Sequence, residues 1–228
     1  MANRLFTQES FNFLTELAAN NRRDWFGEHK ERYETAVRTP ALHFISEIAE
    51  QLPTLSPYFV ALPKKVGGAL MRIQRDTRFG HDKRPYKTNI GIQFRHEVGK
   101  DVHAPGYYLH IEPQGCFLGV GLWRPEPDAL KKIREGILTH DQAWLSARDD
   151  AAFKRHFTLT GDALTNPPRG YPKEHPLIDD LKRKDFIAIA NLKDKEILSK
   201  TLCTTVIDHF QQATPFMRFL CKTLELRF

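Results

Sequence analysis

Positively charged side chains gather in one short segment of the chain. Residues 64–89 contain eight lysines and arginines and only two aspartates, a surplus that equals the formal charge of the whole protein, +6. The rest of the 228 residues is therefore neutral. Such a segment can bind an anion, because arginine offers phosphate or carboxylate a planar fork of donors and lysine offers a point charge. The basic residues are Lys64, Lys65, Arg72, Arg75, Arg78, Lys83, Arg84 and Lys87.

The basic segment is expected to form a strand followed by a long loop. Alternation through residues 68–75 favours a strand with Met71 and Ile73 in the core and Arg72 on the opposite face. The loop that follows, DTRFGHDKRPYKT, is long for a connection between strands, and loops of this length are often functional. The candidate ligand-binding residues of the segment are Arg72, Arg75, Asp76, Arg78, Lys83, Tyr86 and Lys87.

Asp76 stands between two of these cations and has two alternative roles. It can orient the guanidinium groups of Arg75 and Arg78, or it can act as a base. Neighbouring positive charges lower the pKa of a carboxyl group, which argues against Asp76 as a strong proton acceptor.

Three interpretations of the basic segment stay open. It can be ordinary solvated surface in which arginine–aspartate pairs tie the loop down, or a site for an anionic, phosphate-bearing small molecule, with or without catalysis. It can also belong to a nucleic-acid-binding or protein-interaction module without catalytic activity. The interleaved tyrosine, phenylalanine and arginine suit nucleic acid. However, the patch is short and the remaining chain is neutral, which favours the small anion.

Polar residues alternate along a second expected strand. Tyr108, His110 and Glu112 are spaced two apart, so a strand points all three to one face. Leu109 and Ile111 then point to the core. A carboxylate beside a histidine can hold the imidazole in one tautomer, the usual arrangement of a general base, so His110 is the candidate for proton transfer. The alternative is a polar sheet face that is open to solvent or covered by a helix.

Trp123 ends the next expected strand, in the sequence Trp123-Arg124-Pro125. An indole at this place can stack on the ring of a ligand, although a tryptophan here is more typical of a core residue. Tyr108 and Trp123 complete the candidate ligand-binding residues.

Familiar cofactor and catalytic motifs are absent from the sequence. It contains no GxxxxGK[ST] phosphate loop, no GxGxxG fingerprint, no GxSxG elbow and no HExxH pair. The histidines at 96, 103 and 110 lack the close pairing of zinc ligands. The sequence therefore indicates no cofactor and no metal site, and it leaves open whether the protein is an enzyme.

The elements that must position these residues change in kind along the chain. Apolar residues recur every three to four positions over residues 1–55, which predicts helices. Residues 64–125 predict an antiparallel sheet, to which residues 186–191 add a strand, giving about four to five strands. Residues 126–228 are otherwise helical around a proline-rich loop. This order predicts a single α+β domain over residues 1–228, with helices from both ends flanking the sheet.

The composition, 41% hydrophobic and 27% charged, is typical of a globular protein in water. The chain begins without the apolar region of a signal peptide, and no run approaches the roughly 18 apolar residues of a membrane span. Three cysteines without CxxC spacing suit a reducing compartment. We therefore expect a cytoplasmic protein that does not enter a membrane, and the sequence does not indicate its oligomeric state.

Several short motifs, spread over nearly the whole chain, resemble the pattern of a known protein family. The basic segment contains Arg75-Asp76-Thr77-Arg78-Phe79, Asp82-Lys83 and Pro85-Tyr86-Lys87-Thr88. Other matching motifs are Trp25-Phe26, Gly106-Tyr107-Tyr108, Trp123-Arg124-Pro125 and Gly170-Tyr171. The chain in this respect resembles the conserved hypothetical proteins known as domain of unknown function 2461. The resemblance implies an α+β fold and a cytoplasmic location, and it implies no activity.

Overall fold

The computed structural model describes residues 4–78, 82–99 and 104–228, and within these residues six strands form one antiparallel sheet. The strands lie in the order β1-β2-β3-β4-β6-β5. The α+β prediction is confirmed, but two short edge strands were missed, because two or three residues show no alternation. The strands are β1 (Phe59–Val60), β2 (Ile90–His96), β3 (Gly106–Ile111), β4 (Phe117–Leu122), β5 (Thr158–Thr160) and β6 (Phe186–Asn191).

Helices precede and follow the central strands. Those before the sheet are α1 (Gln8–Ala19), α2 (Arg23–Glu28), α3 (Lys30–Tyr33) and α4 (Thr39–Gln51), with a π-helical turn at Glu34–Arg38 and a 3₁₀ turn at Leu52–Thr54. Those after β4 are α5 (Pro127–Thr139), α6 (Asp141–Arg148), α7 (Ala151–His156), α8 (Ile178–Leu181), α9 (Asp194–Ile197), α10 (Leu202–Gln212) and α11 (Thr214–Thr223). Among the described residues, no helix is both long enough and apolar enough to cross a membrane.

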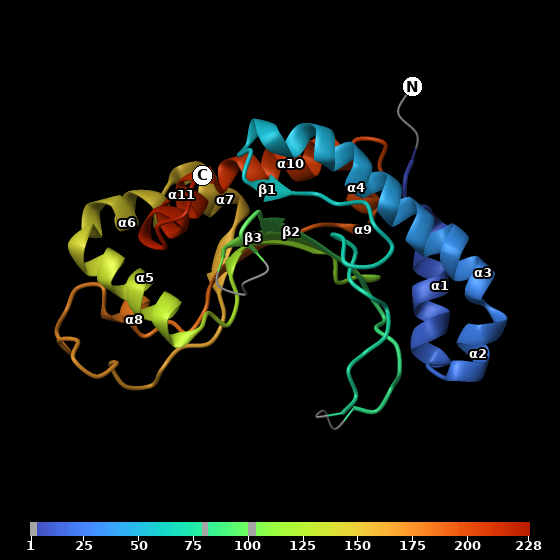
Figure 1. The fold of residues 1–228 in the computed structure, drawn as a ribbon, viewed down its shortest axis with the longest axis horizontal. Coiled ribbons are helices and arrows are strands. Elements are labelled where there is room, and N and C mark those ends of the chain that lie inside the picture. The colour runs from blue at the N-terminus through green and yellow to red at the C-terminus, as the bar shows by residue number, and fades with distance from the viewer. Residues whose placement is uncertain (1–3, 79–81, 100–103) are drawn as a thin grey trace.

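Helices α4 and α10 cover one face of the sheet (Figure 1). The strand residues that face them are large and buried. Phe94 of β2 lies 6.4 Å from the ring of Phe44 in α4 and 6.3 Å from Phe210 in α10. Tyr107 of β3 lies 4.6 Å from the same Phe210. This aromatic layer determines which residues of each strand point the other way, to the face that the helices in Figure 1 leave uncovered at its centre.

Residues 68–75 were predicted to form a regular strand, and this prediction is wrong. The segment contacts β2 through an isolated bridge between Leu70 and Ile92. Beside it, the amide of Met71 donates to the carbonyl of Gly91 at 2.9 Å. These contacts hold the segment against the edge of the sheet, but they are too few to make a continuous ladder.

Beyond Met71 the segment leaves the sheet and pairs with the residues at the far end of the loop 76–88. The amide of Arg75 donates to the carbonyl of Pro85 at 2.9 Å, and the amide of Lys87 donates to the carbonyl of Ile73 at 2.8 Å. Ile73 is buried as predicted, whereas Met71, also predicted to lie in the core, is 38% exposed. Strict alternation fails here because the backbone is not a regular strand.

Candidate functional site

The uncovered face of the sheet contains a cleft of about 580 Å³. Its floor consists of the residues of β3, β4 and β6 that alternate with the buried ones. Three of them are glycines, so backbone is exposed to the cleft at Gly106, Gly119 and Gly121. Ile187 and Ile189 of β6 form an apolar side of the same cleft. The lining is therefore mostly apolar, with backbone accessible in the middle.

The two glycines of β4 differ in whether the fold requires glycine at their positions. Gly121 has a φ of 109°, and a Cβ there would lie 2.1 Å from the carbonyl oxygen of Phe186, so the fold requires glycine. A Cβ at Gly119 would meet only Tyr108, at 3.6 Å, which is an ordinary contact. Packing does not require glycine at position 119. A glycine inside a strand often marks close approach of a ligand, and here it keeps the cleft floor flat.

His110 lies in β3 at one end of the cleft, with contacts at both ring nitrogens. Its Nε2 is 3.3 Å from Oε2 of Glu112, and its Nδ1 is 3.1 Å from the hydroxyl of Tyr108. Because a carboxylate only accepts, we assign the proton to Nε2, so that Nδ1 accepts from Tyr108. Asn89 Nδ2 lies 3.4 Å from the same Nδ1. The structure thus joins the three polar residues of the predicted strand face in one hydrogen-bonded chain.

Burial determines the protonation states of His110 and Tyr108. It lowers the pKa of His110, and the nearby carboxylate of Glu112 only partly opposes this effect. The imidazole also stacks on Phe117, with ring centroids 4.6 Å apart. Burial raises the pKa of Tyr108 to about 12, so its phenol keeps its proton at neutral pH. A neutral imidazole and a neutral phenol therefore border the cleft; both ring nitrogens of His110 are occupied, whereas the hydroxyl oxygen of Tyr108 can still accept a hydrogen bond from a ligand.

The lowered pKa of His110 predicts a loss of stability in mild acid. An unfolded histidine has a pKa of about 6.5, so below that pH the unfolded chain binds more protons than the folded one. The free energy of unfolding should fall as the pH drops from about 6.5 through the lower folded pKa. We expect His110→Gln to lose less stability than the wild type in urea unfolding between pH 7.5 and pH 5. His43→Gln, at an exposed position, should follow the wild type. Equal losses of stability in all three proteins would show that the pKa of His110 is not lowered by folding.

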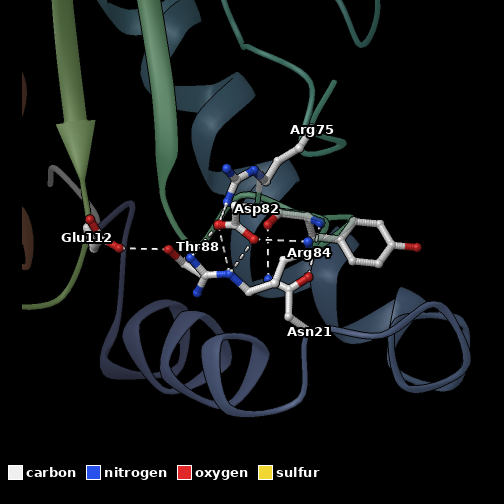
Figure 2. A network of polar contacts seen from close by, with 7 residues as sticks. Asn21, Arg75, Asp82, Arg84, Thr88 and Glu112 are labelled. Carbon is white, nitrogen blue, oxygen red and sulfur yellow. Dashed lines mark hydrogen bonds and ion pairs between the residues drawn. The ribbon is translucent and has the colours of Figure 1, made fainter. Parts of the chain in front are cut away.

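A second hollow, of about 330 Å³, lies at the start of β2. Two residues just before β2 that line it contact residues in and just after β3. Asn89 contacts His110, and the hydroxyl of Thr88 donates to Oε1 of Glu112 at 2.8 Å (Figure 2). The hollow and the cleft are therefore separate concavities whose linings are linked by the contact between Asn89 and His110. The hollow is lined by Arg75, Asp76, Lys87, Thr88 and Asn89.

Lys87 is a half-buried cation in this hollow, and no carboxylate of the described residues pairs with it. Burial lowers the pKa of Lys87, and repulsion by Arg72 and Arg75 lowers it further. Arg72 is exposed and makes no hydrogen bond or ion pair with any residue that the structure describes. Lys87, Arg72 and Arg75 thus repel one another at this hollow, and the carboxylate that lines it, Asp76, is bonded to Arg78. A bound anion would relieve their repulsion.

Asp82 holds Arg75 in position. Nη1 of Arg75 donates to Oδ2 of Asp82 at 2.6 Å, and Nη2 of Arg84 donates to the same oxygen at 2.6 Å (Figure 2). Hydrogen bonds from Arg84, and then from Arg75, keep the pKa of Asp82 well below its usual range. The other N–H groups of Arg75 donate to no acceptor in the described part of the chain, so they remain available to a ligand.

Arg78 and Lys83 make contacts within the loop itself. Nη2 and Nε of Arg78 donate to the two carboxylate oxygens of Asp76 at 2.7 and 3.0 Å. These bonds hold the pKa of Asp76 well below its usual range, which agrees with its expected weakness as a base. Nζ of Lys83 donates to the carbonyl of Thr77 at 2.9 Å. Phe79, the other aromatic residue of the loop, lies outside the described residues.

Tyr86 was predicted to contact a ligand, and the structure places it in the core instead. It is 9% exposed and stacks on Phe26 of α2 at 4.1 Å. The side chain of Asn21 bonds both backbone groups of Tyr86, at 2.9 and 3.0 Å. Tyr86 therefore fastens the end of the loop to the N-terminal helices. The contact joins residues 65 positions apart, which no local pattern indicates.

Trp123 was expected to be a core residue more readily than a site residue, and the structure shows the opposite exposure. It is 63% exposed and lines the cleft. The guanidinium carbon of Arg124 lies 4.7 Å from the centroid of its ring. The amide of Arg124 donates to Oδ1 of the buried Asp185 at 2.6 Å, which anchors the turn. Trp123 thus forms an exposed aromatic rim of the cleft.

Sequence reasoning did not select several residues that line the site. Thr88 and Asn89 stand at the start of a strand, where neither alternation nor charge distinguishes them. A glycine inside an expected strand was a usable signal at position 119. The alternation of β6 could also have indicated a second exposed face. The missed residues are Thr88, Asn89, Gly119, Ile187 and Ile189.

Comparison with known proteins identifies the family of the chain. A family model described as a conserved hypothetical protein (DUF2461) matches residues 9–219. A search of curated proteins found no match. The matched region contains every strand of the sheet, the cleft and the hollow around Lys87.

Proposed function

The chain belongs to the DUF2461 family of conserved hypothetical proteins, and we propose that it binds a phosphate-bearing small molecule at the hollow around Lys87. One observation carries the proposal. Lys87 is half-buried beside Arg72 and Arg75 without a carboxylate partner among the described residues, and burial, followed by repulsion from the two arginines, lowers its pKa. Phosphate is a suitable partner because it can accept the fork of an arginine and the point charge of a lysine together.

The distribution of the other cations favours a small ligand over nucleic acid. Arg78 and Arg84 are paired with aspartates of the loop, and Lys83 bonds a loop carbonyl. The cations that act on the hollow therefore form a local set. A single-stranded nucleic acid would need a groove that follows several successive phosphates. One phosphate group fits the local set better.

His110 and Tyr108 support the same proposal from the neighbouring wall. Tyr108 presents a neutral hydroxyl close to the contact between Asn89, which lines the hollow, and His110, which lines the cleft. In the proposed complex the hydroxyl oxygen of Tyr108 accepts a hydrogen bond from the part of the ligand next to its phosphate. Neutral His110 holds this hydroxyl in place, because its Nδ1 accepts the proton of Tyr108.

A thermal-shift experiment tests the proposal. Inorganic phosphate, phosphorylated sugars and a short oligonucleotide are each added to the wild type, to Arg72→Met and to Lys65→Met. A ligand that binds the folded state raises the melting temperature. We expect a phosphate-dependent rise for the wild type and for Lys65→Met, which removes an exposed cation of the same basic segment outside the hollow. The rise should be clearly smaller for Arg72→Met.

Two results would count against this function. The absence of any shift with phosphate compounds in the wild type would remove its basis. A larger shift with the oligonucleotide, falling steeply as salt is added, would indicate release of many counterions and a nucleic-acid-binding module instead.

A further inference from the structure

The cleft on the uncovered face of the sheet is separate from the hollow around Lys87, and its lining indicates a ligand of its own. The strand register arranges the cleft residues in rows that run across the sheet. One row consists, from β2 to β6, of Arg95, Gly106, Gly121 and Ile187. A cation therefore stands at one side of the floor, bare backbone lies in the middle, and an apolar side chain stands at the other side.

The next row along the strands is also polar at β2 and apolar at β6. It consists of Gln93, Tyr108, Gly119 and Ile189. Gly119 leaves the floor open, although packing would allow a side chain there. Neighbouring strands are about 4.8 Å apart, so the backbones of β2 and β6 lie about 14 Å apart across the floor. The cleft volume of about 580 Å³ is in the usual range for a small-molecule site.

The polar side of the cleft presents hydrogen-bond donors that have no acceptor. Nε of Arg95 donates to Oε1 of Gln93 at 3.1 Å. In the part of the chain that the structure describes, the two terminal nitrogens of Arg95 and the amide nitrogen of Gln93 bond to nothing. A Cβ built at Gly106 would lie 3.7 Å from that amide nitrogen, so this donor lies over the floor. One guanidinium beside one amide donor suits a carboxylate, which carries a single negative charge.

The remaining lining suits a flat apolar group. Ile187 and Ile189 form the apolar side of the cleft, and Trp123 presents a 63% exposed indole at the rim. Aromatic rings of a ligand stack on an exposed indole, and bare backbone at Gly119 lets a ring approach closely.

We propose that the cleft binds an organic acid with a flat apolar ring, its carboxylate paired with Arg95 and Gln93 and its ring on the floor at Gly119. The inference does not depend on the proposed phosphate site at Lys87. An uncharged ring compound would not use the donors of Arg95 and Gln93. An acid without a ring would leave the indole of Trp123 and the floor uncovered. A ligand with both parts matches the polar side and the apolar side of the cleft.

Calorimetric titration with 2-naphthoate and with 2-naphthylmethanol, which share a ring system and differ in charge, tests this inference. The wild type should bind the acid at least about tenfold more tightly than the alcohol, because hydrogen bonds to a charged group contribute at least that factor. Arg95→Met should abolish the difference. Arg23→Met, which removes an exposed arginine of α2 outside the cleft, should keep it.

Two further variants test where the ring lies. Gly119→Val fills the floor, and its first side-chain carbon makes only an ordinary contact with Tyr108. It should weaken the acid and the alcohol by a similar factor, about fivefold or more. Trp123→Ala removes an exposed side chain at the rim and should have the same effect, so the test stays valid if the valine disturbs the sheet.

Several results would overturn the inference. Equal affinity of the wild type for the acid and the alcohol, or an undiminished difference in Arg95→Met, would show that Arg95 recognises no acid. Unchanged binding in both Gly119→Val and Trp123→Ala would show that the compounds bind outside the cleft. Absence of binding to the wild type, together with a dimer in sedimentation that Trp123→Ala dissociates, would assign the cleft to a second copy of the chain. Absence of binding without a dimer would also contradict the acid site.

Discussion

Replacement of Asp180 by alanine is expected to lower the free energy of unfolding by about 3 kcal/mol. The carboxylate of Asp180 is 4% exposed and accepts hydrogen bonds from Nε1 of Trp144, at 2.9 Å, and from Nη1 of Arg148. Without it, the buried indole N–H has no acceptor and Arg148 loses its buried partner. Trp144 in turn packs against Phe186, which begins the strand that forms the apolar side of the cleft.

The neighbouring residue provides a matched control for this prediction. The side chain of Asp179 is 95% exposed, and among the described residues its one ion pair is with Lys182, at 3.6 Å. Asp179→Ala should change the free energy of unfolding by no more than about 0.5 kcal/mol. Urea denaturation of the two variants and the wild type gives both values. A similar, small loss in both variants would show that the Asp180 network does not hold this part of the fold.

The α+β class and the central strands could be predicted because their signals are local. Alternation through β3 placed Leu109 and Ile111 in the core and left Tyr108 and His110 on the other face, as the structure shows. The edge of the sheet was less predictable. The segment around Met71 alternates like a strand, yet it follows β2 only briefly, because its later residues pair with the far end of the loop.

The site was predictable in place but not in detail. A surplus of cations identifies a segment, whereas the partners of each cation depend on the folded path of the loop. Asp82 turned out to bind both Arg75 and Arg84, and Asp76 binds Arg78. Lys87 stands out only after the fold shows that no carboxylate of the described residues pairs with it. Such contacts between loop residues cannot be derived from charge counts.

The position of Tyr86 also could not be predicted from the sequence. An aromatic residue among cations is a reasonable candidate for stacking on a ligand. Its actual partner, Phe26, lies on a helix near the start of the chain. Only a long-range contact distinguishes a residue that anchors the loop from one that binds, and a single sequence does not contain that information.

Charge reversal at Lys87 is expected to weaken the binding of inorganic phosphate by at least about 100-fold. Lys87→Glu removes a cation that the fold holds in the hollow, and it places a negative charge where the phosphate would lie. The new carboxylate can pair with Arg72 or Arg75, which would remove further donors from the ligand. Lys65→Glu makes the same change of charge at an exposed position outside the hollow, and it should reduce the affinity only slightly.

Calorimetric titration of inorganic phosphate into the wild type, Lys87→Glu and Lys65→Glu tests most directly whether Lys87 is the centre of an anion site. Melting temperatures measured alongside establish that all three proteins are folded. The predicted result is binding to the wild type and to Lys65→Glu, with no detectable binding to folded Lys87→Glu. Equal affinity of all three proteins for phosphate would contradict the site.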